Sequence, residues 1–137
     1  MRLLMLHVRD FWYRTHQRNL DSEVERQEEG GMPQGGVLAW VHVESRDLED
    51  PDGTVRKAIK NLKWLARKVG VARVTLHSFA HLSNDTASPE AAQELLGRIA
   101  DRLRGVDFEV LETPWGHFNE FRMHVEGPSL AKVWKEF

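Results

Sequence analysis

The chain of 137 residues contains no cysteine. A disulfide bond, a thiolate nucleophile and a cysteine-ligated zinc site are therefore excluded. Any metal would need histidine and carboxylate ligands, and covalent catalysis would need a hydroxyl or an amine. Long apolar runs are missing too: the run at residues 3–6 stops at His7, which is too short for a signal peptide or a membrane span. We therefore expect a cytoplasmic protein with no membrane partner.

The composition is that of one ordinary globular domain over residues 1–137. Hydrophobic residues make up 41% of the chain and charged residues 29%, with a net charge of −2. The charges are segregated, because residues 54–70 carry six basic side chains and no acid. Such a helix face could contact RNA phosphates, or it could be a solvated face with counter-charges elsewhere. The residues that we predict for a weak contact with nucleic acid are Lys57, Lys60, Lys63 and Arg67.

Apolar periodicity predicts an alternation of strands and helices. One helix follows the turn at residues 50–53, capped by Asp52 or Thr54, and stops at Gly70; the next starts at Ser88; a third runs from Pro128 to the last residue. The glycine-rich residues 30–36 predict a turn or mobile loop, and residues 10–19 either continue the first strand or form an irregular rim. Strands are predicted at residues 2–8, 37–43, 72–77, 107–112 and 117–125.

The short connection at residues 113–116 predicts that the last two strands form an antiparallel hairpin. The helices between earlier strands favour parallel crossovers. The sequence therefore predicts an α/β fold of mixed α+β type, with a mixed sheet and helices packed against it.

Two segments carry reactive side chains where a packed core would not require them. Residues 79–83 (FAHLS) follow the carboxyl end of a strand, where ligands bind in open α/β sheets. The alternative is an ordinary loop with a surface histidine. On the last strand, His117 and Asn119 share the face of Phe121 by the period of two. That pattern fits a pocket mouth and equally a strand end that emerges into solvent.

Rival chemistries have less support. His77 and His81, with His117 or His124, could ligate a metal, but they do not lie on one helical face and no HExxH motif is present. No G-x-S-x-G elbow and no phosphate-binding glycine loop occurs. We predict no metal and no cofactor, and the composition suits a hydrolase that positions a water molecule.

Several separated motifs carry a family resemblance. Residues 78–83 (SFAHLS), residues 114–118 (PWGHF) followed by Phe121, and residues 127–131 (GPSLA) resemble the N-terminal editing domain of archaeal threonyl-tRNA synthetases. The likeness extends over essentially the whole chain, including residues 39–44 (AWVHVE). It implies a relationship to the D-aminoacyl-tRNA deacylases, with their fold and a homodimer.

The resemblance also implies the reaction and the site. The reaction is hydrolysis of L-seryl-tRNA(Thr), in which the terminal 2′-hydroxyl of the tRNA assists water activation. The native chain is then longer, or this domain accompanies a separate synthetase module. The residues implied as catalytic are His81, His117, Asn119 and Glu120. Those implied in substrate binding are Val43, Glu44, Phe79, Ala80, Trp115, Gly116 and Phe118.

The sequence departs from the family pattern in two places. Many members have aromatic residues and then a lysine after the glycine, where this chain has His117, Phe118 and Asn119. Many also carry an acid where Lys132 stands. Two alternatives to seryl-tRNA hydrolysis therefore stay open: a D-aminoacyl-tRNA deacylase and a non-catalytic tRNA-binding appendage.

Overall fold

The computed structural model describes all 137 residues and is organised around one long strand, β1 (Arg2–Arg18). The predicted strand at residues 2–8 is confirmed, and it continues through residues 10–18 without interruption. Bulges between Val8 and Asp10 and between Thr15 and Gln17 let β1 bend and twist. This length lets β1 serve two parts of the sheet.

The sheet has seven strands and mixed directions, as predicted. The first half of β1 pairs with β3 and β7, and its second half pairs with β2 and β6, all antiparallel. β3 pairs with β4 in parallel and β4 with β5 in parallel, and β3 lies inside the sheet. The strands after β1 are β2 (Glu29–Met32), β3 (Gly36–His42), β4 (Arg73–Ser78), β5 (Glu109–Glu112), β6 (His117–Val125) and β7 (Lys132–Glu136).

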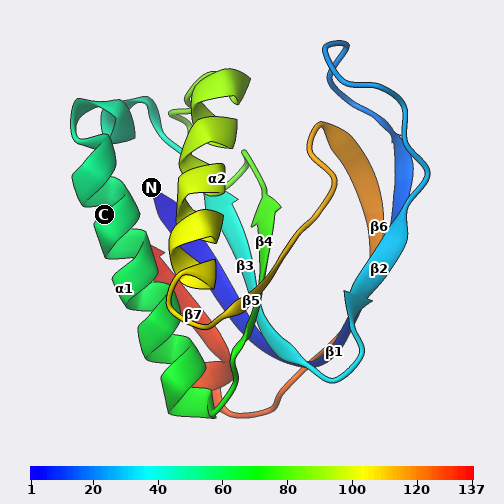
Figure 1. Ribbon diagram of the computed structural model, residues 1–137, viewed down its shortest axis with the longest axis vertical. Helices are drawn as coiled ribbons and strands as arrows, with labels where there is room; N and C mark the ends of the chain where they lie inside the picture. The colour runs from blue at the N-terminus through cyan, green and yellow to red at the C-terminus, as the bar shows by residue number, and fades with distance from the viewer.

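Two α-helices cover one face of this sheet (Figure 1). α1 (Pro51–Val69) is capped by Asp50, whose side chain accepts the N–H of Gly53, so the predicted caps Asp52 and Thr54 are wrong. Gly70 ends α1 in the left-handed conformation, as predicted. α2 (Pro89–Arg104) begins at the predicted cap, Ser88. Short 3₁₀ turns, η1 (Ser45–Glu49) and η2 (Ser129–Ala131), complete the chain.

The apolar side chains form two separate clusters. The larger one, of 22 buried residues, lies between the helices and the sheet and includes most of the apolar side chains of α1 and α2. The smaller one packs between β1, β2 and β3, with partly buried side chains of β6 against it. Its buried members are Val8, Phe11, Tyr13, Met32 and Leu38.

The predicted hairpin of the last two strands is wrong. β5 pairs with β4 in parallel, whereas β6 crosses to the open edge of β1. Residues 113–116 are therefore a connection between two parts of the sheet. A short link can join two strands of a hairpin or two strands in different parts of the sheet. The second arrangement forms because the free edge of β1 has backbone N–H and C=O groups that need partners.

Two further predictions are wrong. The predicted final helix is only η2, after which β7 pairs with Arg2–Leu6 of β1, on the same edge of β1 that β6 occupies further along. The predicted loop at residues 30–36 is strand as far as Met32, with the turn only afterwards. A Cβ at Gly31 would lie 2.0 Å from the Phe11 carbonyl oxygen, so β2 can approach β1 this closely because residue 31 is glycine.

Candidate functional site

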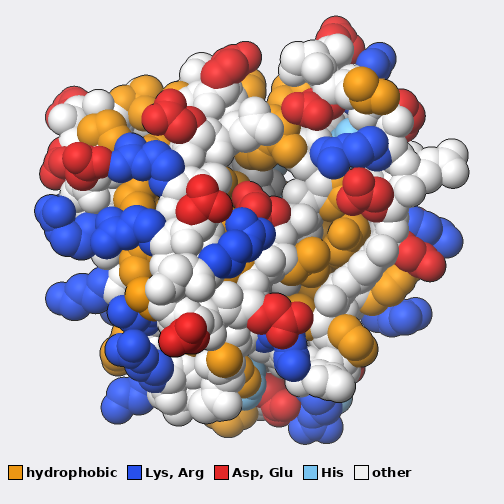
Figure 2. All heavy atoms as spheres, in the orientation of Figure 1, with side chains coloured by type: hydrophobic (Ala, Val, Ile, Leu, Met, Phe, Trp, Pro, Cys, Tyr) orange, Lys and Arg blue, Asp and Glu red, His pale blue; other side chains and the backbone are white.

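A cavity of about 680 Å³ opens where the three parallel strands end. Val43 follows β3, residues 79–81 follow β4 and residues 113–116 follow β5, and all of them line it. The predicted crevice at the carboxyl ends of the strands is therefore present. Figure 2 shows the hollow beside α2, between the helical half of the molecule and the half that contains β6.

Two other elements close the cavity. The beginning of α2 contributes Pro89, Ala92 and Gln93. The segment between β1 and β2 contributes Leu20, Arg26 and other residues of the stretch 19–28. Nothing in the local sequence pattern points to these residues, because they reach the cavity only through the packing of distant elements.

The loop after β4 is held by a buried histidine, His42. Its Nδ1 accepts the N–H of Leu82 at 2.9 Å, so its Nε2 carries the proton and donates to the Asp85 carbonyl oxygen at 2.8 Å. His42 is fully buried on β3. This neutral ring ties both ends of the loop to the sheet and thereby fixes the cavity wall at residues 79–81.

Glu44 is a predicted substrate-binding residue, but it does not line the cavity. It is buried behind the same loop, where its Oε2 accepts the Ser83 hydroxyl at 2.9 Å. Burial alone raises the pKa of Glu44, but hydrogen bonds from the Met1 ammonium group, Ser83, Arg46 and Arg2 outweigh it and lower the pKa to about 2. The structure therefore places Glu44 as a charged anchor of the loop.

His77 lies on the floor of the cavity. Its Nδ1 is 2.9 Å from the Thr113 hydroxyl, and its ring packs edge-on against Trp40 and Phe121. Burial lowers the pKa of His77 to about 4, so the ring is neutral at physiological pH. A neutral ring in this aromatic cluster gives the cavity a rigid floor.

His117 lines the cavity, but the protein uses both of its ring nitrogens. Nδ1 donates to the Trp115 carbonyl oxygen at 2.9 Å, and Nε2 accepts the backbone N–H of Arg26 at 3.1 Å. The side chain is buried at the start of β6. With both nitrogens occupied, His117 holds the segment 19–28 against β6 and has no free lone pair for a substrate proton.

Asn119 lies next to it on the same face, as the period of two predicts. Its Nδ2 donates to the His117 carbonyl oxygen at 3.3 Å, whereas its Oδ1 is buried without any partner. Because Asn119 lines the cavity, this oxygen is an unused acceptor for a ligand. Glu120, predicted as catalytic, points the other way and pairs with Arg14 at 2.9 Å on the exposed face.

The turn between β5 and β6 requires its glycine. Gly116 has φ +70°, and a Cβ there would lie 2.7 Å from Cγ of Glu23. Its carbonyl oxygen accepts the N–H groups of Asn19 and Leu20 at 2.7 and 3.1 Å. Gly116, like its neighbours Trp115 and Phe118, lines the cavity, so three further predicted substrate-binding residues are brought together.

The loop at residues 79–81 supplies the opposite wall. Phe79 packs edge-on against Trp40 at 4.6 Å between ring centroids, which fixes its ring, and His81 packs on Phe79 at 5.2 Å. His81 is otherwise exposed, and its ring nitrogens make no hydrogen bond within the protein. The backbone N–H groups of Ala80 and His81 are likewise unused. This wall therefore offers free donors and one free imidazole.

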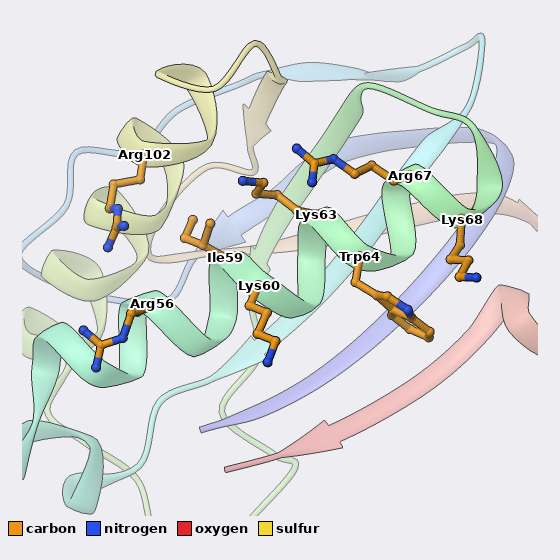
Figure 3. A pocket seen from close by; sticks show the side chains of 8 residues that line it. All are labelled: Arg56, Ile59, Lys60, Lys63, Trp64, Arg67, Lys68 and Arg102. Atoms are coloured by element: carbon orange, nitrogen blue, oxygen red, sulfur yellow. The ribbon is translucent and has the colours of Figure 1, made fainter.

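A second hollow, of about 580 Å³, lies along α1 and faces α2. Figure 3 shows that Arg102 reaches it from α2 and that the other lining side chains come from α1. It contains six basic side chains and no acidic one. Of the predicted tRNA contacts, Lys60, Lys63 and Arg67 line this basic groove, whereas Lys57 is exposed on α1 outside it. The remaining lining residues are Arg56, Ile59, Trp64, Lys68 and Arg102.

The metal alternative has no geometric counterpart, because no three histidine or carboxylate side chains are grouped closely enough to hold an ion. Neither helix of the chain is long and apolar enough to cross a bilayer.

Comparison with solved structures gives the fold. The chain is similar over its whole length to c-Myc DNA Unwinding Element Binding Protein, with a TM-score of 0.65, 12% sequence identity and 99% of that chain covered. At this identity the likeness describes the fold alone.

Comparison with curated sequences gives the family. Threonine–tRNA ligases of Thermococcus kodakarensis, Pyrococcus furiosus and Staphylothermus marinus are 29%, 30% and 32% identical over 97–98% of this chain. The chain spans about a fifth of their length, 22% in each case. The family described as "Archaea-specific editing domain of threonyl-tRNA synthetase" matches residues 1–137. The chain therefore belongs to the archaea-specific editing domain family of threonyl-tRNA synthetase.

Proposed function

We propose that this domain hydrolyses the ester bond of L-seryl-tRNA(Thr), releasing serine and free tRNA. The observation that carries the proposal is the cavity at the ends of β3, β4 and β5, in a chain that belongs to an editing family. Its walls combine unused backbone donors at Ala80 and His81 with the unused acceptor of Asn119. The two backbone donors suit an ester whose carbonyl oxygen gains negative charge during hydrolysis.

The need for a second site follows from magnitudes. Serine lacks only one methyl group of threonine, and a binding pocket gains roughly 1–3 kcal/mol from such a group. A synthetic site therefore admits the smaller amino acid at a substantial rate. A separate cavity that accepts a hydroxymethyl side chain and excludes the branched one supplies the missing selectivity, and in this chain Val43 and Ala80 are small apolar residues available to form that limit.

The reaction places few demands on protein side chains. The substrate is an activated ester, and the terminal 2′-hydroxyl of the tRNA lies next to the scissile bond, where it can orient the attacking water. The protein then contributes orientation and stabilises developing negative charge through the Ala80 and His81 amides. His81 is the imidazole with free ring nitrogens in this wall, so it is the side chain that we assign to proton transfer.

The deciding experiment is hydrolysis of seryl-tRNA(Thr) and threonyl-tRNA(Thr) by the purified chain. We expect seryl-tRNA to be deacylated at least about tenfold faster, which corresponds to about 1.4 kcal/mol. A seryl-tRNA whose terminal adenosine lacks the 2′-hydroxyl should react far more slowly still. Equal rates for the seryl and threonyl esters, or for the 2′-hydroxyl and 2′-deoxy substrates, would contradict the proposal.

The same assay separates the alternatives. Hydrolysis of D-aminoacyl-tRNA but not of L-seryl-tRNA would identify a D-aminoacyl-tRNA deacylase. Salt-sensitive tRNA binding with every aminoacyl ester left intact would identify a non-catalytic appendage. The body of the tRNA is proposed to contact the basic groove on α1, and the homodimer implied by the family stays a proposal that sedimentation of the purified chain would test.

A further inference from the structure

Arg26 is the only lysine or arginine among the residues that line the cavity. Three carboxylates, those of Glu23, Glu28 and Glu112, share this lining. The cavity therefore has one fixed positive charge, and it comes from the segment between β1 and β2. A ligand with an anionic group has a single side chain of opposite charge to meet there.

The guanidinium of Arg26 is held in place but incompletely used. Nη2 donates to the Trp115 carbonyl oxygen at 3.3 Å, and Nη1 donates to Glu28 at 3.4 Å. Nε is buried and makes no hydrogen bond. A buried, unpaired donor on a charged group is costly, so the unused Nε of Arg26 calls for an explanation.

The backbone of Arg26 is fixed as well. Its N–H donates to Nε2 of His117, whose own carbonyl oxygen accepts the amide of Asn119. The unused donor of Arg26 and the unused acceptor of Asn119 are therefore positioned by the same histidine. Nε of Arg26 and the Asn119 oxygen are both buried, but the Arg26 side chain as a whole is 39% exposed. The remainder of the guanidinium therefore lies nearer to solvent than these two atoms.

We propose that Arg26 binds the phosphate that precedes the terminal adenosine of the tRNA, so that the aminoacyl ester reaches the deeper part of the cavity. This rests on the proposed function, which supplies a nucleotide ester as the ligand. A phosphate oxygen is the partner that a guanidinium donor prefers, and the guanidinium is already planar and oriented.

The test compares adenosine 5′-monophosphate with adenosine as ligands of the purified chain, measured by calorimetry. The wild-type chain should bind the monophosphate at least about tenfold more tightly, a preference that falls as salt rises. Arg26→Gln should abolish the preference and leave the affinity for adenosine unchanged, and Arg26→Lys should retain only part of it. Arg122→Gln is the matched control, because Arg122 is exposed on β6 and does not line the cavity.

Several outcomes would overturn the proposal. It is wrong if wild type binds both ligands equally, or if Arg26→Gln keeps the preference for the monophosphate. It is also wrong if both Arg26 variants lose adenosine binding as well, because Arg26 then builds the cavity and does not recognise phosphate. Hydrolysis is not needed for this measurement, so a failure of the proposed function would appear separately, as intact seryl-tRNA in the presence of a chain that still prefers the monophosphate.

Discussion

Nε2 of His117 accepts the backbone N–H of Arg26 at 3.1 Å, which joins the first residue of β6 to a segment 91 residues earlier in the chain. Together with the bond from Nδ1 to the Trp115 carbonyl oxygen, it makes His117 a positioning residue. Arg26 depends on this ring for its placement, whereas the Asn119 amide is held by the backbone carbonyl oxygen of His117.

We therefore expect His117→Ala to lower kcat/KM for seryl-tRNA by about tenfold, equivalent to the removal of roughly one hydrogen bond of about 1.4 kcal/mol. The shape of the pH–rate profile should not change, because the ring is not the proton acceptor. If the variant instead loses the rising limb of that profile, His117 acts as a base and the positioning role is refuted.

Asn119 and Glu120 are neighbours on β6 with opposite orientations. Asn119→Ala removes the unused acceptor from the cavity, and we expect kcat/KM for seryl-tRNA to fall by about tenfold. Glu120→Gln changes only an exposed ion pair with Arg14, which contributes little, so its activity should match that of wild type. Single-turnover deacylation of both variants checks this, and a reversed order of effects would place the substrate on the other face of β6.

Gly116→Ala should damage the site more than the fold. The positive φ costs the new side chain roughly 1 kcal/mol, and its Cβ would press on Glu23, so the segment 19–28 must move away from the cavity. We expect a small drop in unfolding free energy in urea and a decrease in deacylation of more than about tenfold. Gly127→Ala is the control, because no atom lies within 4 Å of the added Cβ and the backbone there is ordinary.

The basic groove predicts a salt-dependent interaction with the tRNA body. Replacing Lys60 and Lys63 by alanine should weaken tRNA binding about equally for charged and uncharged tRNA. It should also reduce the slope of log K against log salt by about one for each phosphate that the variant no longer neutralises. Arg122→Ala, far from this groove along the chain, should leave the slope unchanged. Filter binding across a salt series measures both, and an unchanged slope in the double variant would exclude the groove.

Burial of His77 should make the folded protein less stable in mild acid. Its pKa in the folded protein is about 4, below the ordinary value of 6.5, so the unfolded chain binds the proton more tightly. The contribution is complete above about pH 6.5 and is lost as the pH falls towards 4, by up to about 3 kcal/mol. Urea unfolding of wild type and His77→Leu at pH 7 and pH 5 tests it. The variant should lose less stability between these two values, and an equal loss would show that other groups cause it.

Local patterns are sufficient to predict the two α-helices and most strands, although they also predict a final helix that does not form. Helix ends are set by contacts between near neighbours in the chain, here the turn at residues 50–53, the cap Ser88 and the stop at Gly70. They can therefore be predicted without knowledge of distant contacts. The carboxyl end of β4 is located in the same way, whereas the family resemblance, and not a local pattern, implies that residues 79–81 and 115–119 belong to one site.

Other features depend on partners far away in sequence. The sequence predicts a hairpin for β6 and a helix for β7. A strand's partner is set by free hydrogen-bonding edges, here the edge of β1 that β2 and β3 leave open, and short-range patterns carry no information on that edge. Glu44 and Arg26 illustrate the same limit for the site. Burial and hydrogen bonds turn Glu44 into an anchor of the loop, and folding of the segment 19–28 over β6 brings Arg26 into the cavity. Sequence determined which elements form and which residues carry chemistry, whereas tertiary structure decided which of those residues face the cavity, because only packing across the sheet brings them together.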